Sequence, residues 1–229
     1  MKSKNICINI VLVFFIFFIS ACRTTVIFST SEKDAKIYVD GNLMGTGKTD
    51  VVKLRPLECA KIKTEKIGFF DETLSYCCRN NNLRNIFTPY TKYIELTRDD
   101  AYDASFKDDN ANKDFEQEVN KKFSESDAWK IISQIVTSYF DNIEMADKET
   151  GYLKTSWQSK SFIHKTVRTR IFVKQSSLSP LKYKIKILSE YSDNPDQSVK
   201  DDDRFKEWDR LLRKYEGVIN EFQSRLGSK

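Results

Sequence analysis

The sequence contains few of the residues on which most catalytic and metal sites depend. Among its 229 residues there is one histidine, His164, and no serine lies in a Gly-x-Ser-x-Gly turn. Hydrolases need a nucleophile beside a base, and zinc sites use several histidine or cysteine ligands. The acidic residues gather in runs such as 201–203, where we expect water to solvate them. We therefore expect no enzyme, no metal and no cofactor, and the remaining catalytic alternative is a carboxylate pair in a cleft.

Glycine, proline and an excess of one charge are also scarce. Seven glycines and four prolines, together with 13% aromatic residues, are typical of a packed globular protein rather than a disordered stalk. The 38 lysines and arginines are interspersed with 33 acidic residues. Nucleic-acid binding requires a clustered basic face, so this pattern argues against it. The length allows one large domain or two small ones, and we expect two.

The only long apolar run, residues 10–19, is shorter than the roughly 20 residues of a membrane-spanning helix. It follows Lys2 and Lys4 and ends in Ile19-Ser20-Ala21-Cys22. A charged start, a short apolar core and a small-residue cleavage site are typical of a secretory signal peptide. The final tetrapeptide resembles the pattern of bacterial lipoproteins, in which the cysteine is acylated and becomes the first residue after cleavage.

This resemblance implies a signal peptide at 1–21 and a lipid anchor at Cys22, unless the segment is an uncleaved anchor helix or an ordinary signal peptide. Cleavage would remove two lysines and leave a net charge of +3, with 36 basic and 33 acidic residues. Two or more acyl chains hold a protein at a bilayer almost permanently. We therefore expect a lipid-anchored protein of the bacterial cell envelope. Because no aspartate follows Cys22, the outer membrane is favoured.

An acylated Cys22 leaves three cysteines in the exported chain, Cys59, Cys77 and Cys78. Disulfides are permitted outside the cytoplasm. Neighbouring cysteines seldom bond to each other, so Cys59 would pair with either Cys77 or Cys78. In the alternative, all three stay reduced and pack as small apolar residues.

Residues 22–98 show the pattern of a small all-β sandwich. Residues 35–42 alternate in polarity and end in Asp40-Gly41-Asn42, a strong hairpin signal. Short apolar runs separated by turn residues follow, as expected for more strands. The segment Gly47-Lys48-Thr49 is similar to the end of a phosphate-binding loop, but the first glycine of that motif is missing and a strand pattern follows it.

Three parts of this segment resemble the PEGA domain, a small β-sandwich of bacterial envelope proteins. They are Ile37-Tyr38-Val39-Asp40-Gly41, the later Gly45, and Lys66-x-Gly68-Phe69. The resemblance covers 26–77. The Pro-Glu-Gly-Ala segment itself is replaced by residues 31–35, of which only the alanine is kept. The resemblance implies a non-catalytic surface module.

Residues 99–126 contain many charges, no glycine and no proline, and we expect a charged linker there. The following region, 127–229, predicts an α-β-β-β-α domain with an antiparallel three-strand sheet. Its first helix should start at Ser126-Asp127 and run for about 17 residues. The strands are expected near 151–158, 166–174 and 182–188. The whole chain is thus expected to be an α+β protein.

Apolar residues from Phe205 to Leu226 recur at alternating intervals of three and four, which predicts a final helix. This helix would cover the apolar face of the sheet in its own domain or would dock into a partner. In outline the domain is similar to the helix-grip domains of lipoproteins that accompany the outer-membrane assembly machine. The local resemblance is Thr155-Ser156-Trp157 after the turn 149–151.

Alternation of the three strands places a set of basic residues on the exposed face of the sheet. We expect an acidic partner there, either another envelope protein, an anionic glycan or lipid headgroups; an ordinary solvated strand face is the alternative. The expected function is that of a non-catalytic binding or scaffolding module at the membrane, or of an accessory subunit of an outer-membrane assembly or transport machine. The basic residues are Lys154, Arg168, Arg170, Lys174, Lys182, Lys184 and Lys186.

Overall fold

The computed structural model describes residues 24–55, 58–77 and 89–227. The chain divides into two compact units, 1–99 and 100–229. It is a β-rich α+β protein, and every described helix belongs to the second unit. The expected signal peptide at 1–21, the anchor Cys22 and the third cysteine, Cys78, lie outside the described residues.

The described part of the first unit contains eight strands. They are β1 (Thr24–Thr30), β2 (Lys36–Val39), β3 (Asn42–Thr46), β4 (Lys48–Thr49), β5 (Val52–Leu54), β6 (Cys59–Glu65), β7 (Glu72–Cys77) and β8 (Tyr90–Ile94). Strand β1 pairs antiparallel with β5 and β4 and parallel with β8. Strand β2 pairs with β3 and β6, and β6 pairs with β7. Alternate residues of these strands enclose one apolar core, formed by Val26, Phe28, Ile37, Val39, Val52, Leu54, Ala60, Ile62 and Ile94.

The Asp-Gly turn predicted between β2 and β3 is present. Asp40 and Gly41 form a two-residue loop between Val39 and Asn42, and their φ angles are 51° and 84°. Positive φ at both positions is the geometry of a type I′ turn, whose twist matches that of the flanking strands. The sequence therefore fixes the register of this hairpin locally.

A disulfide joins Cys59 to Cys77, one of the two pairings that the sequence left open. The two cysteines are directly opposite each other on β6 and β7. Because both belong to paired strands, the bond staples a hairpin that the backbone already forms, and in the unfolded chain it closes a loop with a sequence separation of 18 residues.

The second unit is organised around one long hairpin. Its helices are α2 (Asp100–Asp103), α3 (Glu125–Tyr139) and α4 (Val218–Leu226), and its strands are β9 (Ser105–Lys107), β10 (Asp114–Glu118), β11 (Ile143–Asp147), β12 (Tyr152–Thr155), β13 (Gln158–Ser161), β14 (Thr166–Leu178), β15 (Leu181–Ser192), β16 (Lys206–Glu207) and β17 (Arg210–Leu212). Strands β14 and β15 form the long hairpin, and the sheet has the order β10-β15-β14-β12-β11. Strand β13 pairs with β14, β16 pairs with β15, and β9 pairs with β17 in a separate ribbon.

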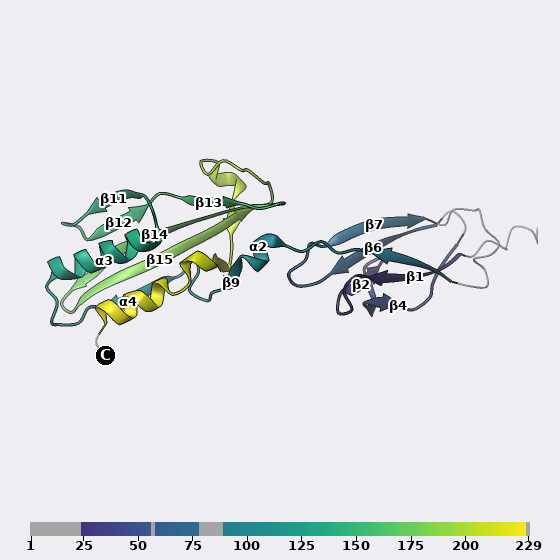
Figure 1. Ribbon diagram of the computed structural model, residues 1–229, viewed down its shortest axis with the longest axis horizontal. Helices are drawn as coiled ribbons and strands as arrows, with labels where there is room; N and C mark the ends of the chain where they lie inside the picture. The colour runs from purple at the N-terminus through teal and green to yellow at the C-terminus, as the bar shows by residue number, and fades with distance from the viewer. Residues whose placement is uncertain (1–23, 56–57, 78–88, 228–229) are drawn as a thin grey trace, which may run out of the picture. The chain divides into compact units, whose positions relative to one another are not determined.

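The helices α3 and α4 lie on the same side of the β14–β15 hairpin (Figure 1). The reason is the alternation of the strands, because Val167, Ile171 and Val173 all point from β14 into one core. Each fully buried side chain of this kind contributes about 1.5–3 kcal/mol to stability. The helices add Ile132, Ile135, Val136, Phe222 and Leu226 to the same core.

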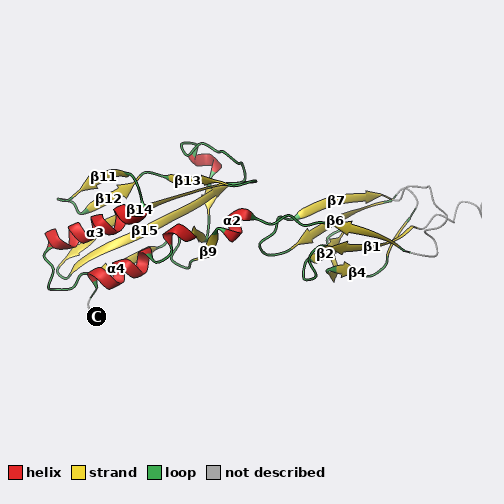
Figure 2. Ribbon diagram, in the orientation of Figure 1, coloured by secondary structure: helices red, strands yellow, loops and turns green. Residues whose placement is uncertain are grey.

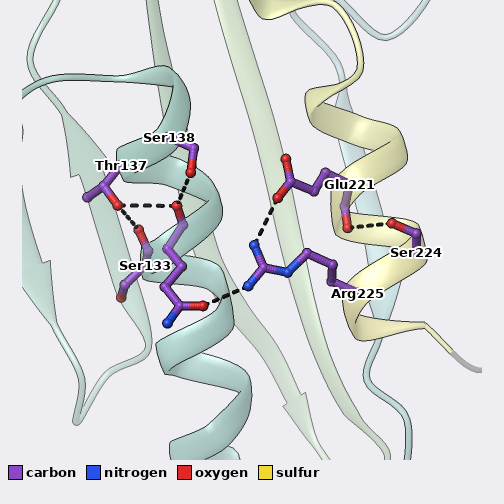
Figure 3. Close-up of polar contacts among 7 residues, drawn as sticks. Ser133, Thr137, Ser138, Glu221, Ser224 and Arg225 are labelled. Atoms are coloured by element: carbon purple, nitrogen blue, oxygen red, sulfur yellow. Dashed lines mark hydrogen bonds and ion pairs between the residues drawn. The ribbon is translucent and has the colours of Figure 1, made fainter.

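Polar contacts at the surface tie the two helices together. Figure 3 shows Arg225 of α4 between Glu221 of its own helix and the neighbouring helix α3. Its Nη1 lies 2.8 Å from Glu221 Oε1, and its Nη2 donates to Gln134 Oε1 at 2.7 Å.

Helix α3 begins two residues before the predicted start. The reason is that Ser124 rather than Ser126 caps it, by accepting a hydrogen bond from the Asp127 N–H at 3.1 Å.

The charged linker expected at 99–126 is wrong for most of its length. Residues 105–107 and 114–118 form strands β9 and β10, and Ala101, Ala111 and Val119 are buried in the second core. Charges on alternate residues are compatible with a strand whose other face is buried, and β10 is such a strand. As a consequence the second unit begins near residue 100, and its sheet has seven strands rather than three.

The final helix expected from Phe205 to Leu226 is also wrong in its first half. In this region Figure 2 shows a short helical turn at Arg213–Tyr215, after strand β17, and the helix α4, which begins only at Val218. Gly217, with a φ of 89°, precedes it and stops any continuous helix from upstream. The three predicted strands exist as β12, β14 and β15, while residues 158–161 form a separate short strand, β13.

Candidate functional site

The candidate site is the face of the second sheet opposite to α3 and α4. On β14 the even-numbered residues from Arg168 to Lys174 point to this outer face, since the odd-numbered ones fill the core. The neighbouring β15 presents Lys182, Lys184 and Lys186 in the same way. The core residues of α3 and α4 lie on the other face of the sheet. All seven predicted basic residues belong to it.

Aromatic rings and cations alternate across this face in a continuous stack, which we call the cation–π ladder. The Arg168 guanidinium lies 4.0 Å from the Phe205 ring centre and 4.1 Å from that of Trp157. The Arg170 guanidinium lies 4.0 Å from the ring centre of Trp157 and 4.8 Å from that of Phe172. Such contacts contribute about 0.5–2 kcal/mol each, more where water is excluded. The ladder is completed by Lys154, 6.0 Å from Phe172.

Arg168 is a structural residue, which corrects its expected role as an exposed partner-binding group. Only 2% of it is exposed. Its Nε and Nη2 are 2.7 and 2.6 Å from Glu190 Oε2, and its Nη1 is 2.7 Å from Asp202 Oδ1. Nη1 also donates to the carbonyl of Val199 at 2.6 Å. Arg168 therefore holds the loop 193–205 against the sheet.

Two of the predicted lysines are paired with acids of the same unit. Lys154 lies 2.8 Å from Glu144, and Lys182 lies 3.6 and 3.7 Å from Glu116 and Glu118. The last two acids belong to β10, where acidic residues oppose the lysines of β15 one by one. This register pairs Asp114 with Lys186, Glu116 with Lys184, and Glu118 with Lys182.

Four predicted residues make no ion pair with any residue that the structure describes: Arg170, Lys174, Lys184 and Lys186. They form one connected group, since Lys174 is directly opposite Lys184 and the ring of Phe172 is opposite Lys186. Arg170 and Lys186 are half-buried, whereas Lys174 and Lys184 are exposed, and burial lowers the pKa of the Arg170 guanidinium. The Arg170 Nε is buried without a hydrogen-bond acceptor in the described structure. This group, which we call the open cation group, is the part of the face that can bind an anion.

Sequence reasoning found the cations and missed the rings that orient them. The signal for Phe172 was available, because it shares the parity of Arg168 and Arg170 on β14. Trp157 and Phe205 come from loops, where no periodicity reports the direction of a side chain.

The first unit contains a hollow of about 410 Å³, which is a second candidate for a binding site. Its charges already neutralise one another: Lys66 contacts both Glu32 and Asp34, and these two carboxylates raise the pKa of its ammonium. Lys63 likewise lies 3.0 Å from Asp71. The hollow therefore has less unpaired charge to offer a ligand than the open cation group. Its lining residues are Asp34, Lys36, Glu65, Lys66, Ile67 and Asp71.

The fold and this face define a two-unit, β-rich α+β protein with a charged and aromatic sheet surface. Within the described ranges no helix is both long and apolar enough to span a bilayer. In the same ranges no three histidine, cysteine or acidic side chains gather in a metal-binding arrangement. No protein-family model matches the chain, and no curated protein is significantly similar to it.

Proposed function

We propose that this chain is a lipid-anchored protein of the bacterial envelope, at the outer membrane, that binds another envelope component without catalysing a reaction. The anchor would be Cys22, exposed by removal of residues 1–21. The first unit would be a PEGA-like sandwich held near the lipid. Its type I′ turn at Asp40-Gly41 and its enclosed apolar core are features that support this assignment.

The observation that carries the binding function is the open cation group on the outer sheet face. Four cations that make no ion pair within the described ranges lie on one hairpin, and Arg170 among them contacts the rings of Trp157 and Phe172. A surface of this kind favours an anionic partner. The final helix is not available for the same purpose. Its apolar residues Val218, Phe222 and Leu226 are buried in the core of the second unit, which leaves the sheet face as the docking surface.

Site-specific photo-crosslinking in intact envelopes tests the binding function. A photoreactive amino acid at Lys186 should capture a defined partner, whereas the same group at Lys130, exposed on α3, should not. A partner that also copurifies stoichiometrically in mild detergent would identify a dedicated subunit of a larger machine. Capture of no partner, or of the same products from both positions, contradicts the proposal.

Metabolic labelling tests the anchor separately. The wild-type chain should incorporate a labelled fatty acid and sediment with membranes. The Cys22→Ser variant should lose the label and move to the soluble fraction. An unlabelled wild-type chain, or a labelled variant, would show that the anchor is not at Cys22.

A further inference from the structure

The two arginines of the cation–π ladder share one aromatic ring but differ in what they bind. The Trp157 ring lies about equally close to both, at 4.1 Å from Arg168 and 4.0 Å from Arg170. Arg168 is occupied by carboxylates from Glu190 and Asp202. Arg170 meets no carboxylate at ion-pair distance among the described residues, and its Nε has no acceptor there. The ladder thus contains one arginine that is paired with carboxylates and one that is not.

The contacts of Arg168 indicate which kind of ligand the ladder accepts. Asp202 and Phe205 both belong to the loop 193–205, and they contact Arg168 with a carboxylate and with a ring. A guanidinium fixed between rings presents its donors in one plane, which suits the planar carboxylate group. The ligand at this end of the ladder is a segment of acidic polypeptide.

Strand β10 shows the same preference along the neighbouring strand. Its acids at 114, 116 and 118 recur at every second residue, and each opposes one lysine of β15. Residues of one strand face repeat at roughly 6.6 Å, so an extended chain with acids at alternate positions matches lysines at alternate positions. Lys184 and Lys186 have this spacing, and neither is ion-paired within the described structure.

One contact within the open cation group is unfavourable, although Glu116 of β10 opposes Lys184 from the other side. Lys174 and Lys184 are directly opposite each other on β14 and β15, and like charges in that position repel. Arg170 and Lys174 share a face and are roughly 13 Å apart along the strand, at about 3.3 Å per residue. A bound chain with carboxylates at alternate positions would reach both ends of this group.

From this geometry we propose that Arg170, Lys174, Lys184 and Lys186 bind an extended acidic peptide segment of a partner protein, with Asp or Glu at alternate positions. This inference rests on the proposed binding function and assigns the chemistry of the partner. Arg170 receives one carboxylate between Trp157 and Phe172, and the lysines receive the next ones. The loop 193–205 marks one end of the binding surface, because its Val199 carbonyl and its Asp202 carboxylate already contact Arg168.

The test uses the full chain in non-ionic detergent at low salt. The probe is a fluorescently labelled twelve-residue peptide of alternating Glu and Thr, and the matched control peptide carries Gln in place of Glu. Binding should be detected for the Glu peptide, should change the fluorescence of Trp157, and should fall steeply as salt is added. Equal binding of the two peptides, or of neither, overturns the proposal.

Variants locate the site. Arg170→Gln should weaken peptide binding by at least about tenfold, and Lys186→Gln by about fivefold. Lys130→Gln on α3 removes the same charge from the helical side and should change binding less than about twofold. Because Lys186 is on the surface and its replacement leaves the core intact, it keeps the test valid if Arg170→Gln unfolds the protein. Unchanged binding by Lys186→Gln contradicts the site.

A polymer of galacturonate, a carboxylate glycan, serves as the competing probe. Tighter binding of this polymer than of the Glu peptide at equal charge assigns the face to an acidic glycan and overturns the peptide proposal. The peptide-binding experiment and the crosslinking experiment test different proposals. A partner captured at Lys186 without binding of the Glu peptide would reject only the acidic-peptide assignment, whereas absence of any captured partner would reject the binding function itself.

Discussion

Neutralising Glu190 should destabilise the second unit far more than neutralising Asp202, although both carboxylates contact the same arginine. Arg168 is 2% exposed, and the Glu190 side chain is 19% exposed. Glu190→Gln leaves the buried guanidinium facing a neutral amide. Removing one partner of a buried ion pair costs about 3–5 kcal/mol. Since Asp202 still contacts Arg168, we expect the lower end of this range, about 3 kcal/mol.

Asp202→Asn is the matched control. The Asp202 side chain is 78% exposed, so water solvates its charge and screens the contact. Ion pairs of this kind contribute about 0–1 kcal/mol, and we expect a loss of less than about 1 kcal/mol. Each variant removes one negative charge that contacts the Arg168 guanidinium. The two carboxylates differ in how deeply they are buried, and Glu190 contacts two nitrogens of the guanidinium where Asp202 contacts one.

Urea unfolding followed by tryptophan fluorescence measures the effect on the second unit alone. All three tryptophans, Trp129, Trp157 and Trp208, lie in that unit, and Trp157 stacks directly on Arg168. The midpoint should fall clearly for Glu190→Gln at an unchanged slope. If Asp202→Asn costs as much as Glu190→Gln, or if both cost less than about 1 kcal/mol, burial does not set the strength of this contact and our reasoning is refuted.

Three further outcomes follow from the packing. Burial raises the pKa of Tyr183 to about 12, above its ordinary value of 10.0. The stability linked to this group is therefore intact below pH 10 and is lost as the pH rises towards 12. Tyr183→Phe should flatten that decline, and an unchanged pH profile of stability would contradict this expectation. Replacing Cys59 and Cys77 together by alanine should cost the first unit about 3 kcal/mol in urea unfolding followed by circular dichroism, and a loss below about 1 kcal/mol would count against the bond. Phe222→Ala should cost the second unit about 3–5 kcal/mol by tryptophan fluorescence, because the side chain is fully buried; a loss near zero would place α4 outside the core.

Local patterns in the sequence predicted the elements whose burial alternates regularly. Strands β12, β14 and β15 and helix α3 each have one apolar face, and these were predicted with the correct type. The Asp40-Gly41 turn was predictable because the type I′ geometry requires residues that tolerate positive φ. In each case the signal lies within a few neighbouring residues.

Strand β10 was missed because what makes it a strand lies elsewhere in the chain. Its acids at 114, 116 and 118 resemble a solvated linker when they are seen alone. They form a strand since each opposes a lysine of β15, about 70 residues later in the sequence, while Phe115 and Val119 pack on the second core. The charge complementarity is visible only when the two segments are paired.

The final helix shows that a pattern of burial does not fix the secondary structure. Leu212, Tyr215, Phe222 and Leu226 are all buried, as the spacing of three and four residues predicted. The first two are nevertheless in strand β17 and a 3-10 turn, because β17 pairs with β9 and Gly217 interrupts the chain before α4. The sequence pattern of 99–126 does not predict β9, and without β9 nothing in the sequence indicates a strand at 210–212.

Strand β10 and the loop 193–205 together change what the basic face can recognise. Seven cations on an open sheet would attract any polyanion, since attraction between exposed charges depends little on geometry. The chain neutralises three of them with its own carboxylates, at Lys154, Arg168 and Lys182. The remaining four differ in character, because Arg170 contacts two aromatic rings while Lys174 and Lys184 are exposed. A partner must therefore place one carboxylate at the guanidinium and others at the spacing of the strand, and selection by position in this way gives specificity that a uniform basic surface lacks.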